Sequence, residues 1–394
     1  MGIILFDDQF RANLFPLAFT RPISEFRIGI LTIAEKWKRY LNSNISYLTE
    51  DYLQEKYPIS IESDNLFINS AFCPDQDLLS AISALNEGEA LFSDSLLIAL
   101  RLNESGANEF DLNVLSAFRK IEYHLPFVRI EFPEHIFLRN GEEIIKDFEL
   151  ITKGRSSANL SSTNTIIGNQ IFIEDGVDAE CSTFNTKLGP IYLGKDSLIM
   201  EGCHIRGPFA LCNHAILKMG AKIYGMTTIG PHSKAGGEIN NSVIFANSAK
   251  GHEGYLGNSV LGEWCNIGAD SNNSNMKNNY AEVRLWDYKT ERFRKTGIQF
   301  CGLIMADHAK CAINTMFNTG TVVGVSTNLF GSGFPRNFVA DFSWGGNQGF
   351  DVYPLKRVFE TATQAYKRRG ADFNEIEQKI LSHVFGLTEK YRRF

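Results

Sequence analysis

Apolar residues recur at every sixth position through the middle of the chain. The positions in register are Leu193, Ile199, Ile205, Leu211, Leu217, Ile223, Ile229 and Ala235, and the series returns at Met305, Cys311, Phe317, Val323 and Leu329. An α-helix repeats every 3.6 residues and a half-buried strand every two, so neither explains this period. A six-residue period is typical of a hexapeptide-repeat parallel β-helix, in which three hexads complete each coil.

The same repeat predicts which other side chains point inward. Four residues after each of these anchors stands a mostly smaller residue, such as Ser197, Cys203 or Ala215. One bulky and one small inward side chain per hexad suit a flat, three-sided coil. From about residue 155, Gly, Asn, Ser and Thr become frequent, as short turns at each corner require. We therefore expect the β-helix to span residues 151–345.

The first 150 residues show a different pattern, because runs typical of buried strands alternate with stretches of helical periodicity. We expect strands at 3–6, 45–49 and 65–71, helices at 29–41 and 75–86, and further strand material at 89–102. Strands that alternate with helices favour a parallel sheet covered on both faces. The sequence therefore predicts an α/β domain of Rossmann-like type over residues 1–150.

Two segments depart from the repeat near its end. Residues 276–298 interrupt the hexads and alternate in polarity like a hairpin. Inserts of this kind map to one face of a solenoid, often the binding face. Helical patterns then predict a C-terminal cap over residues 346–394. Such a cap would cover the open end of the coil, where the last strands present unpaired backbone groups.

Composition and charge exclude several classes of protein. A length of 394 residues indicates two or three domains, and a net charge of −6 argues against nucleic acid as a partner. Seven cysteines without a CxxC pair point to a reducing cytoplasm. The first ten residues lack the basic segment of a signal peptide, and no apolar run reaches transmembrane length. We therefore expect a cytoplasmic protein without a membrane partner.

Polar residues crowd into the repeat over residues 249–275. The elements Gly251-His252, Tyr255-Leu256-Gly257, Leu261-Gly262 and Asn266-Ile267-Gly268-Ala269 stand there, with Asn275 following. Their order and spacing resemble the acetyltransferase half of the bifunctional glucosamine-1-phosphate acetyltransferase / N-acetylglucosamine-1-phosphate uridylyltransferase family. That family carries GH-x-x-YLGD-x-x-(I/L)G-x-x-x-NIGAG and a later asparagine. The resemblance implies a left-handed coil and a homotrimer that binds acyl-CoA between adjacent coils.

The resemblance also implies roles for individual residues. His252 would be the general base, since only a free amine can attack a thioester and an imidazole can accept its proton. Asn275 would stabilise the developing oxyanion through its amide. The remaining positions imply sugar-phosphate contacts at Tyr255 and Asn266 and acetyl-CoA contacts at Gly268 and Ala269.

Two departures from the family pattern concern substrate recognition. Met276 replaces a tyrosine, which removes an aromatic contact, and Asn240 replaces a basic residue twelve positions before the histidine. Phosphate recognition must therefore be rebuilt, and Lys234 and Lys222 are the candidates.

The N-terminal domain carries a second resemblance. Residues 11–37 echo the opening of sugar-nucleotide pyrophosphorylases at Arg11, Pro16-Leu17, Thr20, Pro22 and Arg27. Together with residues 141–155, this stretch resembles a shortened branch of the same bifunctional family. That branch implies a nucleotidyltransferase domain.

The usual glycine-rich phosphate loop is missing from this domain, because no glycine occurs between Gly2 and Gly29. Backbone amides therefore cannot cradle a triphosphate in the usual way. Guanidinium groups suit phosphate, and carboxylates suit Mg²⁺. Asn69 stands where a metal-binding aspartate is expected. The candidates for the nucleotide are Arg11, Arg21 and Arg27, and those for Mg²⁺ are Asp7 and Asp8. Alternatively, the three arginines form structural ion pairs and the domain has no turnover.

Two histidines raise the question of a metal. His214 and His232 lie 18 residues apart, one full coil, and should stack on each other. One interpretation is zinc binding across a subunit boundary, in the manner of γ-class carbonic anhydrases. The other is a solvent-facing histidine ladder, which the lack of an obvious third histidine favours.

Taken together, the sequence predicts a sugar-phosphate N-acetyltransferase joined to a UTP-type nucleotidyltransferase domain, acting in UDP-N-acetylglucosamine synthesis. Its partners would be a sugar phosphate, acetyl-CoA and a nucleoside triphosphate, with Mg²⁺ for the second reaction. Two alternatives stay open. In one, the coil only oligomerises a nucleotidyltransferase, as in some ADP-glucose pyrophosphorylases. In the other, the protein is a non-catalytic sugar-nucleotide sensor.

Overall fold

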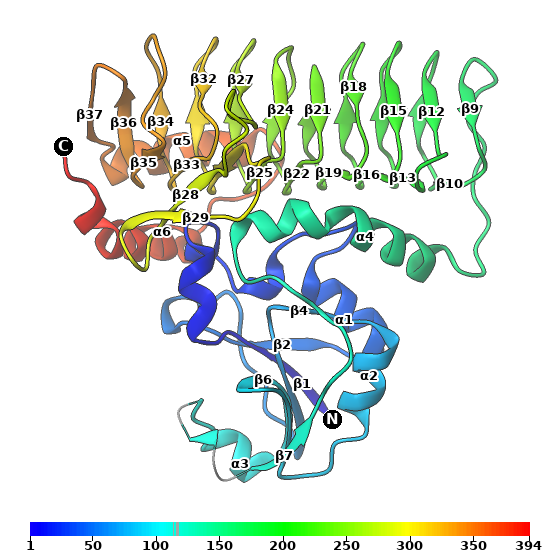
Figure 1. Cartoon of the computed structure of the whole chain (residues 1–394), viewed down its shortest axis with the longest axis vertical. Helices are drawn as coiled ribbons and strands as arrows, with labels where there is room; N and C mark the ends of the chain where they lie inside the picture. The colour runs from blue at the N-terminus through cyan, green and yellow to red at the C-terminus, as the bar shows by residue number, and fades with distance from the viewer. Residues whose placement is uncertain (113, 116–117) are drawn as a thin grey trace. The chain divides into compact units, whose positions relative to one another are not determined.

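The computed structural model describes residues 1–112, 114–115 and 118–394 and divides into two compact units (Figure 1). The first unit comprises Met1–Leu14, Thr20–Phe26 and Leu31–Glu131, and the second comprises Phe15–Phe19, Arg27–Ile30 and Phe132–Phe394. The hexapeptide repeats fall wholly in the second unit.

The first unit is built on a six-stranded sheet with the order β2-β1-β3-β6-β5-β7. Its strands are β1 (Gly2–Phe6), β2 (Ile45–Leu48), β3 (Asp64–Asn69), β5 (Glu89–Ser93), β6 (Leu96–Asn103) and β7 (Arg119–Glu122). Strand β1 runs parallel to β2 and β3, whereas β6 runs antiparallel to β3 and β5. The α/β class is confirmed, but the sheet is mixed rather than wholly parallel, since β5 and β7 are also parallel whereas both pairs of β6 are antiparallel. The chain turns back directly between β5 and β6, so no crossover helix separates them.

Short helices and a small second sheet complete this unit. They are α1 (Ile33–Leu41), α2 (Gln76–Ser83), α3 (Glu104–Asn108), and the antiparallel pair of β4 (Phe72–Cys73) and β8 (Val128–Arg129). Helix α1 begins at a capping box, in which Thr32 and Glu35 bond to each other's backbone N–H groups. The buried Trp37 of α1 donates its indole N–H to the carbonyl of Phe72 at 2.9 Å. The helix is thereby fixed to β4.

The second unit is a left-handed parallel β-helix with three faces. Face 1 contains β10 (Ile171–Ile173), β13 (Ile191–Leu193), β16 (Phe209–Leu211), β19 (Thr227–Ile229), β22 (Val243–Ile244), β25 (Val260–Leu261), β30 (Leu303–Met305), β33 (Thr321–Val323) and β35 (Phe338–Val339). Face 2 contains β11 (Asp178–Ala179), β14 (Leu198–Ile199), β17 (Ile216–Leu217), β20 (Lys234–Ala235), β23 (Ala249–Lys250), β26 (Asn266–Ile267), β31 (Lys310–Cys311), β34 (Asn328–Leu329), β36 (Ser343–Gly346) and β37 (Gly349–Val352). Face 3 contains β9 (Thr165–Ile167), β12 (Thr183–Asn185), β15 (His204–Arg206), β18 (Lys222–Ile223), β21 (Glu238–Asn240) and β24 (Tyr255–Gly257), followed along the coil by the pair β27 (Asn272–Asn273) and β32 (Met316–Phe317).

The six-residue period is confirmed by the core of the coil. All anchors from Leu193 to Ala235 are at most 2% exposed, and they belong to one continuous apolar cluster. The smaller residues Ser197, Cys203 and Ala215 are buried as well. Burying one large aliphatic side chain stabilises a fold by about 1.5–3 kcal/mol. This contribution, repeated along the coil, stabilises the packing of the short strands.

Helix α4 (Pro133–Thr152) packs along face 1 against β16, β19, β22 and β25 (Figure 1). Its Asn140 accepts from the N–H of Gly29 at 2.7 Å and donates to the carbonyl of Met226 at 2.8 Å. These contacts place α4 with the second unit, although the sequence suggested a boundary near residue 150. None of the helices in the described part of the chain combines the length and the apolar character that crossing a bilayer requires.

The insert and the C-terminal segment pack on the coil. The insert forms the predicted antiparallel hairpin of β28 (Arg284–Asp287) and β29 (Arg292–Lys295). The two C-terminal helices are α5 (Leu355–Lys367) and α6 (Glu375–Leu387). They pack at the corner between faces 1 and 2, where Tyr366 stacks on Trp264 with ring centroids 3.7 Å apart. Strand β37, antiparallel to β36, continues the last coil of face 2. Helix α6 also reaches the last coil, where Phe385 contacts Phe342 with ring centroids 5.1 Å apart.

Candidate functional site

His252 lies in the turn that joins face 2 to face 3, between β23 and β24. Its side chain is exposed and forms no hydrogen bond or ion pair with any described residue. The next coil carries Gly268 and Ala269 in the same corner, and the N–H of Asp270 donates to the carbonyl of Glu253 at 3.0 Å. We call the turns at residues 251–254 and 268–271 the His252 corner. The structure thus places the predicted base and the predicted acetyl-CoA contacts one coil apart.

Lys250 is a site residue that the sequence reasoning missed. It pairs with the anchor Ala235 on the neighbouring strand, so its side chain points into the coil, where it is 2% exposed. Its ammonium donates to the carbonyl of His252 at 2.5 Å. Burial lowers the pKa of Lys250 to about 8. The sequence did contain a signal for this residue, because Lys250 follows the anchor Ala235 by 15 residues, which is one short coil.

Tyr255 is held by a cluster of asparagines on face 3. Its hydroxyl accepts from the amide of Asn275 at 2.9 Å, and that amide also donates to Asn258 at 2.8 Å. A Cβ on Gly257 would lie 2.2 Å from the Tyr255 hydroxyl, so the glycine lets the ring lie over the strand. Burial raises the pKa of Tyr255. Asn275 is therefore engaged in positioning Tyr255 in this conformation, whereas the resemblance assigned its amide to an oxyanion.

A cavity of about 520 Å³ lies at the far edge of face 3. Its polar wall includes Asn240, Asn241, Asn258 and Gln299, and its apolar wall includes Met226 and Phe300. The buried amide oxygen of Asn241 has no hydrogen-bond partner among the described residues. Amides both donate and accept, so this wall suits a ligand rich in hydroxyl groups. Strand β24, which carries Tyr255, separates the cavity from the His252 corner.

The two candidate phosphate ligands flank the His252 corner from different faces. Lys222 on face 3 forms an exposed ion pair with Glu253, with 3.3 Å between the nitrogen and the carboxylate. Lys234 on face 2 has its Cβ 4.0 Å from where a Cβ on Gly251 would be. Burial, Arg369 and Lys218 together lower the pKa of Lys234. Asn266 lies in the same outward row of face 2 as Lys234, two strands along.

The predicted histidine stack is confirmed. The rings of His214 and His232 lie 4.8 Å apart and 13° from parallel, at the corner between faces 1 and 2. Burial, His214 and Arg369 lower the pKa of His232, and a guanidinium beside the stack disfavours a further cation. Within the described residues, no group of three or more His, Cys, Asp or Glu side chains could hold a metal ion.

In the first unit, polar side chains gather where β1 and β3 end. Asp8 follows β1 and accepts from the amide of Asn69, at the end of β3, at 2.8 Å. Arg129 lies 4.0 Å from Asp8, and two of its buried nitrogens have no hydrogen-bond acceptor among the described residues. The carboxyl ends of adjacent parallel strands are where open α/β sheets bind ligands. Nothing in the sequence around Arg129 singled it out.

The other N-terminal candidates are engaged in structural contacts. Asp7 is buried and forms an ion pair with Arg11 at 3.2 Å, while also accepting from Thr49 at 2.6 Å. Burial raises the pKa of Asp7. Arg21 is buried in the same unit, and its carbonyl accepts from Arg11 at 3.5 Å. Arg27 belongs to the second unit, where it donates to the carbonyl of Ile30. The three arginines therefore do not form one phosphate site within the first unit.

Comparison with known proteins finds similarity in both parts of the chain. Residues 3–156 match a family described as sugar nucleotidyl transferase. The bifunctional protein GlmU of Thermus thermophilus is 26% identical over 218 residues, which cover 48% of this chain and 48% of the relative. GlmU of Methanocaldococcus jannaschii is 32% identical over 89 residues, 22% of this chain and 21% of the relative. The chain thus matches about half the length or less of these relatives.

Solved structures were found with low overall similarity. The UDP-N-acetylglucosamine acyltransferase of Francisella novicida is 13% identical, with a TM-score of 0.25, covering 59% of this chain and 78% of that one. The Arabidopsis enzyme of the same name is 16% identical, with a TM-score of 0.18, covering 60% and 82%. Residues 3–156 are therefore similar to the sugar nucleotidyl transferase family, and the chain, which carries a hexapeptide β-helix after them, is distantly similar to GlmU proteins over about half its length.

Proposed function

We propose that the β-helix transfers an acetyl group from acetyl-CoA to the amine of an amino-sugar phosphate, with glucosamine 1-phosphate as the first candidate. The observation that carries this proposal is the His252 corner, where an exposed imidazole stands one coil from Gly268 and Ala269. In this reaction the amine nitrogen bonds to the thioester carbon and the C–S bond breaks. His252 takes the proton from the amine and returns it to the departing thiolate.

Positive charge beside the corner supports binding of phosphorylated substrates. Burial is the largest cause of the lowered pKa of Lys234, and the neighbouring cations Arg369, Lys218 and Arg368 lower it further. A phosphate group bound among these cations would reduce their mutual repulsion. Coenzyme A and a sugar phosphate both carry such groups. We assign this side to the coenzyme, and Lys222 on face 3 to the sugar phosphate. Gly268 and Ala269 would then lie beside the pantetheine arm.

The amide-lined cavity supports a sugar on the other side of Tyr255. Asn240, Asn241 and Asn258 offer donors and acceptors to hydroxyl groups, and Tyr255 lies between them and His252. Asn266 is exposed on face 2 and would contact substrate from that side. Because His252 is open to solvent, a second copy of the chain would supply the remaining wall. We therefore propose a homotrimer.

The test replaces His252 by alanine. Acetyl transfer from acetyl-CoA to glucosamine 1-phosphate, followed by release of free thiol, should fall roughly 10²–10⁴-fold, as expected when a general base is lost. His204→Ala, which removes an exposed histidine from another coil of face 3, is the matched control. Light scattering should give the same mass for both variants. A His252→Ala rate equal to that of the wild type would remove His252 from the mechanism.

For the first unit, we propose transfer of a uridylyl group to a sugar 1-phosphate at the ends of β1 and β3. Asp8 is the carboxylate there that would hold Mg²⁺, which commonly takes one or two carboxylates together with substrate phosphates. The ion would neutralise charge on the triphosphate. Arg129 has the unsatisfied nitrogens to bind a phosphate.

A binding role alone is the second candidate for this unit, and the Asp7–Arg11 pair favours it, because these two groups neutralise each other. Incubation with UTP, Mg²⁺ and N-acetylglucosamine 1-phosphate distinguishes the two. Release of pyrophosphate supports the transferase. No release with any nucleotide or sugar phosphate, together with a nucleotide-induced rise in melting temperature, supports the binding role.

A further inference from the structure

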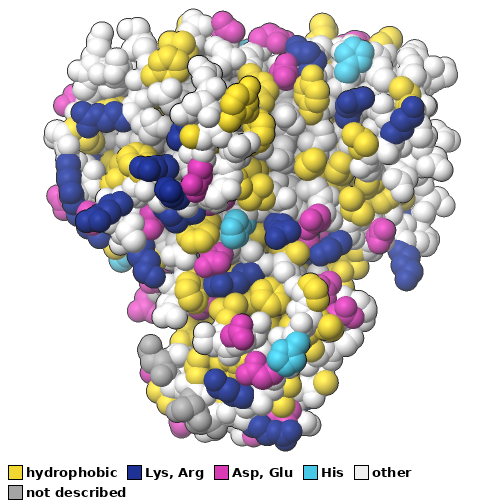
Figure 2. All heavy atoms as spheres, in the orientation of Figure 1, with side chains coloured by type: hydrophobic (Ala, Val, Ile, Leu, Met, Phe, Trp, Pro, Cys, Tyr) yellow, Lys and Arg dark blue, Asp and Glu magenta, His cyan; other side chains and the backbone are white. Residues whose placement is uncertain are grey.

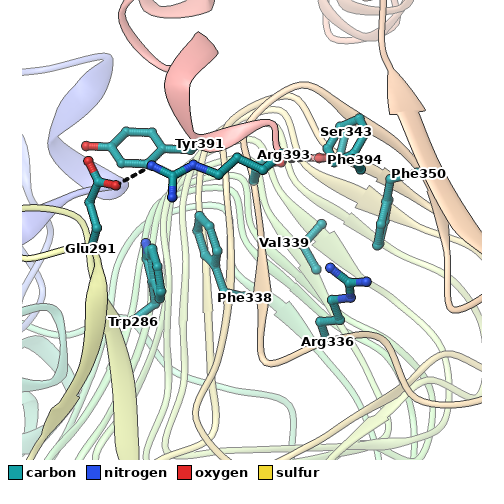
Figure 3. A pocket seen from close by; sticks show the side chains of 11 residues that line it. Trp286, Glu291, Arg336, Phe338, Val339, Ser343, Phe350, Tyr391, Arg393 and Phe394 are labelled. Atoms are coloured by element: carbon teal, nitrogen blue, oxygen red, sulfur yellow. Dashed lines mark hydrogen bonds and ion pairs between the residues drawn. The ribbon is translucent and has the colours of Figure 1, made fainter.

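The insert that the sequence marked as a binding face forms a pocket with the last coil and the C-terminal end (Figure 3). Trp286 and Glu291 come from the insert, Arg336 and Phe338 from the last coil, and Arg393 from the C-terminal segment. The volume is about 150 Å³. A protein cavity of this size binds a single benzene ring. None of these residues belongs to the sites described above.

Aromatic rings form the walls of this pocket. The rings of Trp286 and Phe338 are stacked, with centroids 4.2 Å apart and planes 12° from parallel. Phe350 and Phe394 pack against each other at 5.9 Å and also line the pocket. Figure 3 shows Phe338 beside Trp286, with Phe350 across the pocket. Flat walls of this kind favour a planar ring, since aromatic pairs gain energy beyond the area that they bury.

The polar groups of the pocket favour a negative charge on that ring. Arg336 is exposed and has no hydrogen bond or ion pair with any described residue, and the buried indole N–H of Trp286 has no acceptor among them. Glu291, the one acidic side chain among the lining residues, is already paired with Arg393 at 2.6 Å and with Lys390 at 3.5 Å. Figure 2 shows Lys and Arg side chains gathered around the hairpin and the C-terminal end. Among the side chains at this pocket, Arg336, Arg393 and Lys390 therefore outnumber the one carboxylate, Glu291.

We propose that this pocket binds a small anion built on one planar ring, an aromatic carboxylate or an aromatic phosphate ester. The ring lies against Phe338 and Phe350, and its anionic group is held by Arg336. The indole N–H of Trp286 supplies a further donor to an acceptor atom of the ligand. This site is independent of both proposed transfer reactions.

Isothermal titration of the full chain with benzoate and with phenyl phosphate tests the proposal and distinguishes the two anion types. At least one probe should bind, and Arg336→Gln should weaken that binding about tenfold or more, as expected when a charge-assisted contact is lost. Arg292→Gln is the matched control, because it removes an exposed arginine of the same hairpin that does not line the pocket. Trp286→Phe should abolish any ligand-induced change in tryptophan fluorescence.

Two uncharged or non-planar probes complete the test. Benzyl alcohol, which has the ring without the charge, and cyclohexanecarboxylate, which has the charge without the flat ring, should each bind at least tenfold more weakly. The proposal would be overturned if neither benzoate nor phenyl phosphate bound the wild-type chain at roughly 10 mM, a concentration at which even a millimolar Kd would be detected. It would also be overturned if Arg336→Gln bound these probes as tightly as the wild type. Equal binding of cyclohexanecarboxylate would overturn the assignment to planar rings.

Discussion

Lys250 shows how one residue can oppose the fold that surrounds it. The inward column of face 2 holds Ala235 before it and Ile267 after it, and an ammonium among such residues loses its hydration. One acceptor, the carbonyl of His252, compensates only part of that loss. The fold therefore accepts a proton at this amine less readily than the unfolded chain does, which is why the pKa falls from 10.5 to about 8.

This difference makes a prediction about stability and pH. Between about pH 8 and pH 10.5 the unfolded chain binds the proton that the folded chain has lost, so the free energy of unfolding should rise with pH across that interval. Below pH 8, protonation of Lys250 lowers the free energy of unfolding by its full amount, about 3 kcal/mol for a pKa shift of this size. Lys250→Met should therefore be more stable at pH 7 by about 2–3 kcal/mol and should lose the rise. Urea unfolding at pH 7 and pH 9.5 measures both, with Lys195→Met, on an exposed turn, as control. A variant less stable than the wild type at pH 7 would contradict the argument.

At the scale of elements, periodicity predicted what repeats and missed what depends on direction or contact. The hexads predicted the coil because each anchor packs against the anchor that follows it by one full coil, which is three hexads. The pattern at 89–102 predicted strand structure. It did not predict that the chain turns back at Asp94 between β5 and β6, because both halves of the run are equally apolar. Helix α4 was missed although its buried residues Ile136, Ile144 and Ile151 carry a helical spacing. The C-terminal helices were expected, but their position at a corner depends on an aromatic stack formed only in the fold.

That stack predicts where the stability of the C-terminal segment resides. Tyr366 is 6% exposed, lies on Trp264 at 3.7 Å and contacts Phe373 at 5.3 Å. Tyr366→Ala should destabilise the second unit by about 3 kcal/mol, the usual cost of removing a buried aromatic ring. Tyr280→Ala, at a tyrosine that is 64% exposed, should change stability by less than about 0.5 kcal/mol. Thermal unfolding of both variants checks this. Equal melting temperatures would mean that α5 is held by other contacts.

At the scale of the whole molecule, the two candidate sites differ in how far the sequence could predict them. In the coil, residues one coil apart become neighbours at one corner, so the motif that the resemblance singled out over residues 251–275 places His252 and Ala269, 17 residues apart, in the same corner. In the first unit no such rule exists. Arg11 proved to be the partner of a buried Asp7, and Arg129 reaches the strand ends from a segment 121 residues after Asp8. Contacts of that kind depend on packing rather than on spacing.

Because the proposed groups belong to separate compact units, the two reactions should respond to mutation independently. Asp8→Asn removes the carboxylate at the ends of β1 and β3 and should lower pyrophosphate release with UTP by roughly 10²-fold or more, since electrostatic stabilisation of a transferring phosphoryl group is of that size. It should leave thiol release from acetyl-CoA within twofold of the wild type. His252→Ala should show the opposite pattern. Both assays on both variants, on the same protein preparations, provide the check. If Asp8→Asn also lowered acetyl transfer tenfold, the two reactions would not be independent, and the proposal of two separate sites that act without each other would be contradicted.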